Sequence, residues 1–580
     1  MLLRHWFLLL FVGLVALSGC EPALSLPATE VVDRGETAVV PPSATPQATI
    51  TPPPTIAPTL LPTVTPASTA PAYDLSISPD SLYLYPVPYI VDGDQVTIQV
   101  IPYVPEVVPW EEVTVHLYLN GEALADTTLV WRNIAARPEA LFEWVWDTTG
   151  LAGEHELQIV LDHEGRIQFG YENPDNNQTT LTVAVQPGGI HSASETNAAW
   201  VMAENVCCRV HTVTGTAAYR DLPDLLNLLD SAIQQASAQL SEPLQRKIDV
   251  YFIDRVIGQG GYAGSSIVVS YLDRQYNGQG LYETLVHEAV HVIDRQFAPR
   301  RISFLAEGVA VWATGGHYKP EDLASRSAAL VSMGEYIPLD LLANDFYPVQ
   351  HEIGYLQAGS FVKYLVDSYG WSRFRDFYSD VTLEDALTPS GALDLNLQLY
   401  YDKTMAEMEA EWLAYLAEVA WEETAVIDLA TTIRYYDTMR HYQLLYDPTA
   451  HFLTAWLPYP HDVRDRGNPA DLTRRPRADV NIALEALLAS ADEALRAADY
   501  SRANVLLDSV ARVLDNDGAF LDPLAINYLN IVRAAAAEGY EVQSVRLEGN
   551  RAEIFTTKGG GVHLSKFNVT LRGQDWVLTN

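Results

Sequence analysis

The stretch His287-Glu288-Ala289-Val290-His291, followed by Phe304-Leu305-Ala306-Glu307-Gly308, decides how the central part of this 580-residue chain is interpreted. Residues four apart on a helix lie one turn above each other on the same face, so His287 and His291 can point their imidazoles at one metal ion. The surrounding residues 281–293 are mainly apolar and predict a buried helix. A pair of histidines at this spacing in such a helix needs a reason other than packing. The sequence therefore predicts a metal site.

Glu307 is the expected third ligand. It stands sixteen residues after His291, which is enough for the first helix to end near Pro299 and for a second helix to bring a carboxylate back. Two imidazoles and one carboxylate form a typical ligand set for a catalytic zinc ion and leave a fourth position for water. The predicted cofactor is one Zn²⁺ ion.

Glu288 is the expected catalytic base. It lies one step around the helix from His287, so its carboxylate can reach the open coordination position without occupying it. Zinc lowers the pKa of a bound water towards neutrality. Glu288 would take a proton from that water as it attacks a carbonyl, and would then pass the proton to the leaving amine.

The two motifs resemble those of the gluzincins, the zinc peptidases that include thermolysin and the aminopeptidase N type, and most closely the bacterial peptidase MA-like domains. The resemblance covers about residues 205–420 and implies an α+β zinc metallopeptidase domain, which we place at residues 195–422. The metzincin pattern fits worse, because Asp294 and Phe297 stand where that pattern has Gly and His.

The same resemblance implies a second catalytic residue. Residues 355–361 are similar to the segment in which aminopeptidase-type gluzincins carry a tyrosine that binds the tetrahedral oxyanion, which assigns this role to Tyr355. A buried aromatic residue that only packs at the start of a helix is the alternative.

A substrate site is implied by the strands before the motif helix. Residues 247–253 and 264–271 alternate like strands. In gluzincins the strand before the zinc helix is the sheet edge along which a peptide lies, which places substrate binding at residues 263–269. The expected contact residues are Ala263, Gly264, Ser265 and Ser266. Residues 260–264 contain no glutamate to hold a free amino terminus, so endopeptidase action is somewhat favoured over aminopeptidase action.

Three further residues are candidate neighbours of the metal site. Asp294 and Glu283 each lie one helical turn from a motif histidine and can orient it through its other ring nitrogen. We nevertheless expect both on a solvated helix face, and we expect His351 in a surface loop.

The amino terminus resembles a bacterial lipoprotein signal. Residues 1–20 combine Arg4 and His5, an apolar run, and the ending Leu17-Ser18-Gly19-Cys20. The resemblance implies lipidation at Cys20, so we expect an extracytoplasmic protein of the bacterial cell envelope that is lipid-anchored to the membrane. Residues 21–72 are rich in Pro and Thr and predict a disordered linker.

Composition narrows the partners. The formal net charge is −38, from 36 basic and 74 acidic residues, which argues against nucleic acid. A peptide or protein substrate and the membrane, through Cys20, are the expected partners, and the oligomeric state stays open.

The other two of the three cysteines, Cys207 and Cys208, cannot join distant segments to each other. We expect them to be buried in a strand at residues 206–213, with metal binding as the alternative.

The flanking regions predict further domains. Residues 73–187 contain short strands separated by turns such as Asn120-Gly121, which predicts an antiparallel Ig-like β-sandwich that resembles the CARDB domain. Residues 423–580 contain a helical pair at 478–515, broken near Asp499, and then four strands. They predict a small C-terminal helical plus β domain that resembles the NTF2-like fold.

The expected fold class is therefore multidomain: a β-sandwich, a domain that resembles the thermolysin-like gluzincin peptidases, and a small C-terminal α+β domain. The predicted function is hydrolysis of peptide bonds by a membrane-anchored extracytoplasmic zinc metallopeptidase. The alternative is a cell-surface binding or envelope-organising lipoprotein with a weakly active or inactive peptidase-like domain. The intact Glu288 favours the enzyme.

Overall fold

The computed structural model describes residues 74–579, except 106–107, 135–136, 168–172, 190–194, 196–197, 259, 452–458 and 468. The predicted signal at residues 1–20, including Cys20, and the predicted linker at 21–72 lie outside the described residues. In the part that is described, no helix has both the length and the apolar character needed to cross a membrane.

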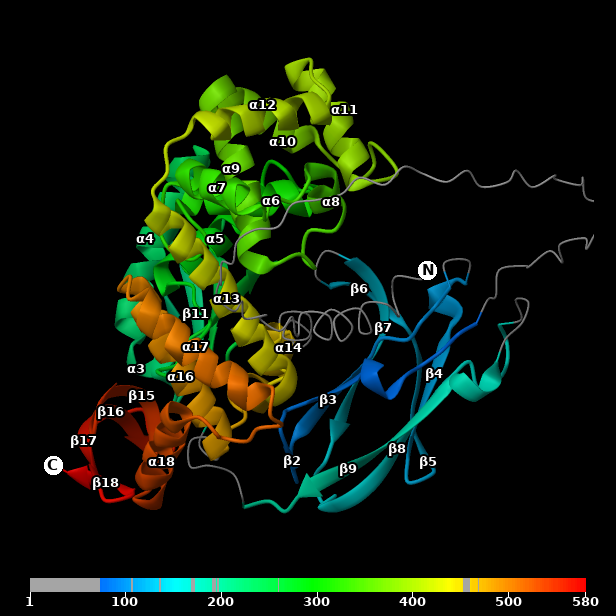
Figure 1. Ribbon diagram of the computed structural model, residues 1–580. Helices are drawn as coiled ribbons and strands as arrows, with labels where there is room; N and C mark the ends of the chain where they lie inside the picture. The colour runs from blue at the N-terminus through cyan, green and yellow to red at the C-terminus, as the bar shows by residue number, and fades with distance from the viewer. Residues whose placement is uncertain are drawn as a thin grey trace, which may run out of the picture. The chain divides into compact units, whose positions relative to one another are not determined.

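The first described region is a β-sandwich, coloured blue to cyan in Figure 1. One sheet has the order β1-β3-β7-β6 and the other β2-β9-β8-β4-β5. Alternate residues of β4 and β8, such as Val115 and Ile159, are completely buried between the sheets. The elements are η1 Pro79–Ser81, β1 Leu82–Tyr85, β2 Ile90–Val91, β3 Gln95–Val100, η2 Trp110–Glu112, β4 Thr114–Leu119, β5 Glu122–Thr128, β6 Val130–Ile134, β7 Arg137–Asp147, β8 Gly153–Leu161, η3 Pro174–Asn176 and β9 Gln178–Gln186.

The predicted Ig-like sandwich is confirmed, but its purely antiparallel pairing is wrong at one place. Strand β2 pairs parallel with β9. Because most of the domain separates these two strands in sequence, no hairpin turn fixes their relative direction. The predicted turn Asn120-Gly121 does connect the antiparallel strands β4 and β5, and both residues have the positive φ that such a turn requires, 52° and 80°.

The central region contains a five-stranded sheet of order β10-β11-β12-β14-β13. Strands β11, β12 and β14 are parallel, and the two outer strands pair antiparallel to their neighbours. The bounds are β10 Trp200–Glu204, β11 Cys208–Val213, β12 Ile248–Ile253, β13 Gly261–Ala263 and β14 Ile267–Ser270. Cys207 and Cys208 are buried at the start of β11, as expected, and form a disulfide bond with each other.

Helices follow this sheet and build one large hydrophobic core with it. The leucines of α4 recur on one face, so that Leu225, Leu229 and Leu240 are buried. Helix α5 packs against α4, α6 and both strands β13 and β14. The helices of this region are α3 Ala217–Arg220, α4 Leu222–Leu240, α5 Leu281–Asp294, α6 Ser303–Thr314, α7 Leu323–Met333, α8 Leu339–Asn344, α9 His351–Tyr369, α10 Trp371–Asp380, α11 Pro389–Tyr401 and α12 Met405–Glu418.

The last region combines helices with a four-stranded antiparallel sheet of order β15-β16-β17-β18, coloured yellow to red in Figure 1. Helices α16 and α18 pack against β15, which confirms a small C-terminal α+β fold. The elements are α13 Glu423–Tyr446, α14 Pro460–Arg466, α15 Ala470–Thr473, α16 Asp479–Arg496, α17 Tyr500–Leu514, α18 Pro523–Ala537, β15 Tyr540–Glu548, β16 Arg551–Lys558, β17 Ser565–Arg572 and β18 Asp575–Thr579.

Helix α13 links the central and C-terminal cores. It begins at the predicted domain boundary after residue 422. Its residue Leu429 packs in the core of the central region, whereas Tyr435 packs in the core that holds α16 to α18. The second core also contains Leu272 and Tyr318, which precede the boundary. The two regions therefore pack directly on each other.

Candidate metal centre

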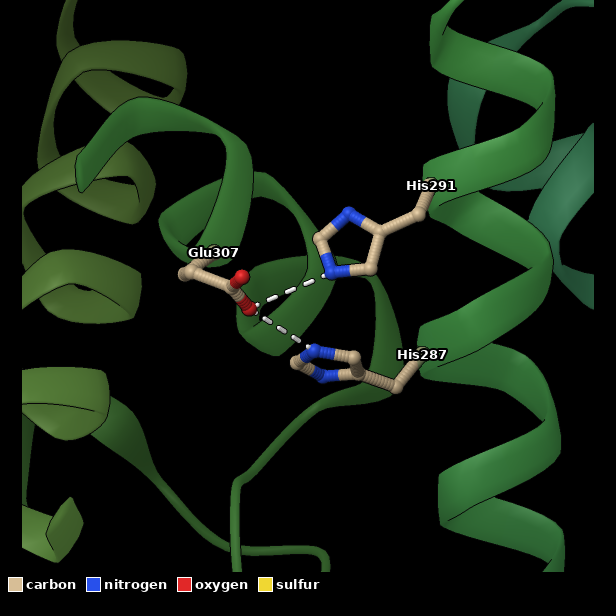
Figure 2. Close-up of side chains that lie close together, drawn as sticks. All are labelled: His287, His291 and Glu307. Carbon is tan, nitrogen blue, oxygen red and sulfur yellow. Dashed lines mark hydrogen bonds and ion pairs between the residues drawn. The ribbon is translucent and has the colours of Figure 1, made fainter. Parts of the chain in front are cut away.

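Helices α5 and α6 bring together the three predicted metal ligands. Figure 2 shows the imidazoles of His287 and His291 pointing from one helix towards the carboxylate of Glu307. The Nε2 atoms of the two histidines lie 3.0 Å and 3.2 Å from Glu307 Oε2. One ligand atom from each residue lies within 4.8 Å of the other two, and the three side chains are buried. Helix α5 ends at Asp294, five residues before the expected end at Pro299, which lies in the loop between the two helices.

The donor atoms fit a zinc ion. Ligand atoms about 2.0–2.1 Å from a tetrahedral zinc ion lie roughly 3.3 Å from one another. The measured separations between the Glu307 oxygen and the two imidazole nitrogens, 3.0 Å and 3.2 Å, are close to this value. Two nitrogens and one carboxylate oxygen are also the donor types that zinc prefers.

The electrostatics of the site favour the ligating forms of Glu307 and His291. Burial acts to raise the pKa of Glu307, but the neighbouring histidines hold it well below its usual value. Burial lowers the pKa of His291 to about 4. Burial also acts to lower the pKa of His287, but the hydrogen bond to Glu307 and the charge of Glu288 raise it. An ionised carboxylate and a neutral imidazole are the forms that bind metal.

Close packing of α6 against α9 explains the glycine that follows Glu307. A Cβ atom on Gly308 would lie 2.7 Å from the carbonyl oxygen of Ala358 and 2.8 Å from Val362 Cγ2. A larger residue would therefore push α6 away from α9. The glycine of the second motif keeps Glu307 at its place opposite the two histidines.

Glu288 lies beside the ligands and beneath an edge strand. Its side chain is buried, and burial raises its pKa to about 7, against the effect of the adjacent His287. A Cβ atom on Gly261 would lie 3.4 Å from Glu288 Cγ and 3.0 Å from Thr284 Cγ2. Strand β13 thus runs directly over the expected base.

The edge strand differs from the prediction. The outermost strand next to α5 is β13, whereas β14 lies between β12 and β13 and is paired on both sides. The chain doubles back after Ala263, and Gly264, Ser265 and Ser266 form the connection. The prediction that residues 263–269 form the edge of the sheet is therefore wrong beyond Ala263. Strand β14 pairs with the preceding strand β13, and β13 is the edge strand.

Arg295 at the end of α5 holds this turn. Its guanidinium donates hydrogen bonds to the carbonyl oxygens of Ala263, at 2.9 Å, and Gly264, at 2.7 Å. These two carbonyls are thereby tied to the motif helix. The edge strand and the metal ligands form one connected unit.

Asp294 is buried, contrary to the expected solvated face. Its side chain is 0% exposed, forms an ion pair with Arg301 at 3.2 Å and accepts a hydrogen bond from the Tyr378 hydroxyl at 2.7 Å. Arg301 also donates to the carbonyl oxygen of His291. Through Arg301, Asp294 therefore holds the backbone after the motif. It is buried because α10 and the loop between α5 and α6 cover the end of α5. Glu283 is half-buried and turns towards Gly280, away from the motif histidines.

Tyr355 lies near the ligands on α9. Its ring centroid is 6.0 Å from that of His287, and the side chain is 4% exposed. Burial and the charge of Glu307 raise the pKa of its hydroxyl, so the phenol stays protonated and can donate a hydrogen bond. His351, expected on a surface loop, is instead the buried first residue of α9, and its ring packs 4.4 Å from that of Tyr355.

Tyr347 is a site residue that the sequence did not indicate. Its hydroxyl donates a 2.8 Å hydrogen bond to Oε1 of Glu307, the oxygen that does not face the histidines. The residue lies between α8 and α9, outside any motif. A single tyrosine in a connecting segment carries no pattern that marks it as a neighbour of Glu307.

Replacing Tyr347 by Phe is expected to weaken zinc binding about 10- to 100-fold, because partners that orient a ligand contribute this much to metal affinity. Competition with a chromophoric chelator measures the change. Tyr336→Phe is the matched control, since that hydroxyl bonds Glu409 instead. Equal zinc affinities of the two variants and the wild type would show that Tyr347 does not orient Glu307.

Comparisons with known proteins give similar solved structures at low identity. No family model and no curated protein matches the chain. A CARDB domain from Pyrococcus furiosus is 19% identical, with a TM-score of 0.16 over 19% of this chain and 87% of that one. An M1 zinc metallopeptidase from Deinococcus radiodurans is 12% identical, with a TM-score of 0.28 over 59% of this chain and 92% of that one. An aminopeptidase N family protein from Idiomarina loihiensis is 11% identical, with a TM-score of 0.17 over 87% of this chain and 97% of that one.

Proposed function

We propose that this protein is a zinc metallopeptidase that hydrolyses peptide bonds outside the cytoplasm. The observation that carries the proposal is the convergence of His287, His291 and Glu307 on one point, with Glu288 buried beside them. A bound zinc ion would act there as a Lewis acid that polarises a carbonyl and lowers the pKa of water.

The chain's own residues supply the proton transfers. Glu288 takes the proton from the attacking water and delivers it to the leaving amine. Its burial supports this role, because a carboxylate removed from solvent holds a proton more readily. The protonated phenol of Tyr355 donates to the oxygen on which negative charge develops.

Strand β13 offers a place for the substrate backbone. It is an edge strand of three residues, and Gly261 lies against Glu288. An extended peptide that adds to this edge would use main-chain hydrogen bonds and would tolerate varied side chains. Residues 260–264 carry no carboxylate to bind a free amino terminus, which favours cleavage within a chain. The signal-like residues 1–20 support export and anchoring at Cys20.

A peptide library tests this function in the soluble form of the chain that lacks residues 1–20. We expect zinc-dependent cleavage that stops when 1,10-phenanthroline removes the metal and returns when zinc is added. Peptides with a blocked amino terminus should be cleaved as efficiently as peptides with a free amino terminus. Failure to cleave any member of the library while zinc is bound would contradict the peptidase and favour a binding protein.

A further inference from the structure

A buried histidine outside both motifs packs against the expected oxyanion donor. His317 lies between α6 and α7 and is 1% exposed. Its ring centroid is 4.6 Å from that of Tyr355, and the two ring planes are 29° apart, so the rings are stacked. His317 thus covers one face of the Tyr355 phenol near the metal ligands.

Glu352 fixes the orientation of His317. Its Oε2 lies 2.6 Å from Nδ1 of the imidazole, and its side chain is 0% exposed. Glu352 and Tyr355 stand three residues apart on α9, so they lie on the same face of that helix. His317 therefore binds one residue of this face and stacks on the other. The arrangement sets the plane of the imidazole and with it the space open to the phenol.

Further buried charges anchor Glu352. Its Oε1 accepts a 3.1 Å hydrogen bond from Arg326 of α7, and Arg326 also pairs with Asp428 of α13. Replacing buried ionic groups by apolar residues of similar volume is often neutral or stabilising. Stability alone is therefore a weak explanation for why these charges are buried. Orientation of the His317 imidazole, which Glu352 binds, is a stronger explanation.

The direction of the Tyr355 hydroxyl depends on how the ring is held. His351 and Phe346 contact the same ring, with centroid distances of 4.4 Å and 5.0 Å. Of the His317, His351 and Phe346 rings, the described residues show a carboxylate bond only for His317, from Glu352. His287, whose ring centroid is 6.0 Å from the same phenol, is bound by Glu307 as an expected metal ligand.

We propose that His317, oriented by Glu352, is a positioning residue that holds the Tyr355 hydroxyl towards the developing oxyanion. The inference rests on the proposed peptidase function. His317 itself takes no part in bond making. Its contribution is to keep the hydrogen-bond donor in place, and a displacement of about 1 Å in such a group costs as much as 100-fold in rate.

A double-mutant cycle tests this role in the zinc-loaded chain. We expect His317→Phe to lower kcat about 10- to 100-fold with little change in KM. In the Tyr355→Phe background the same substitution should cost nothing further, because the hydroxyl that it positions is gone. Tyr436→Phe is the matched control. That ring contacts His317 at 5.6 Å, and loss of its hydroxyl should leave kcat unchanged.

Two measurements are independent of turnover. Calorimetry with a phosphonamidate peptide, whose tetrahedral anionic group resembles the oxyanion, should show a loss of affinity in His317→Phe equal to the loss in kcat. A crystal structure of the variant should show the Tyr355 ring turned from its wild-type position. Glu352→Gln, which is nearly the same size, should reproduce both changes and replaces His317→Phe if that variant fails to fold.

The outcomes separate the two proposals. Additive losses in the cycle, an unmoved Tyr355 ring, or full activity of Tyr355→Phe would each overturn the positioning role of His317 while the peptidase stands. A zinc-loaded wild type that neither cleaves peptides nor binds the phosphonamidate would overturn the peptidase, and the role of His317 with it.

Discussion

Glu288→Gln is expected to lower kcat/KM for peptide cleavage by about 10²- to 10⁴-fold, the usual contribution of a positioned general base. Glutamine has nearly the same size, but its amide cannot take a proton from water. Because Glu288 lies beside the three ligands and is not one of the converging donors, zinc content should stay at the wild-type level. Steady-state kinetics and metal analysis of the same preparation measure both quantities.

The matched control for this variant is Glu283→Gln. Glu283 stands on the same helix but is half-buried and turns away from the site. It should keep wild-type activity. A Glu288→Gln protein that is fully active would show that another group acts as base, and one that has lost its zinc would make Glu288 part of the metal site.

Arg274→Met is expected to destabilise the protein by about 3–5 kcal/mol, the cost of leaving a buried charge without its partner. Arg274 is 0% exposed and its Nε lies 2.5 Å from Oε2 of Glu485, which is 2% exposed. The same guanidinium binds Glu541 at 3.1 Å and the carbonyl oxygen of Val542 at 2.6 Å. It therefore joins the segment after β14 to α16 and β15.

Urea unfolding, followed by circular dichroism, measures the change in unfolding free energy. Arg546→Met provides the control, because its ion pair with Glu493 is more than half exposed on both sides, at 56% and 57%. Such surface pairs contribute about 0–1 kcal/mol. If Arg274→Met proves as stable as Arg546→Met, the central and C-terminal regions do not depend on this buried network.

Local sequence patterns predicted the elements that carry the site. The apolar residues of α5 recur at helical spacing, so the predicted range 281–293 agrees closely with the helix. The spacing of His287, His291 and Glu307 in the sequence likewise predicted that two consecutive helices bring these side chains together. Each of these predictions depends on residues within one helix or on two consecutive helices.

Features that depend on contacts between distant segments were missed. Tyr347, His317 and Glu352 are single residues without a spacing rule, and only the packing of α9 against its neighbours brings them to the site. Asp294 was expected on a solvated helix face, yet Tyr378 of α10 covers it.

The central claim is that His287, His291 and Glu307 hold one zinc ion. Anomalous diffraction from crystals of the zinc-loaded protein, recorded on both sides of the zinc absorption edge, tests it most directly. The account predicts one strong anomalous peak, bounded by Nε2 of His287, Nε2 of His291 and the carboxylate of Glu307. No peak at that point, or a zinc ion held by other residues, would contradict it.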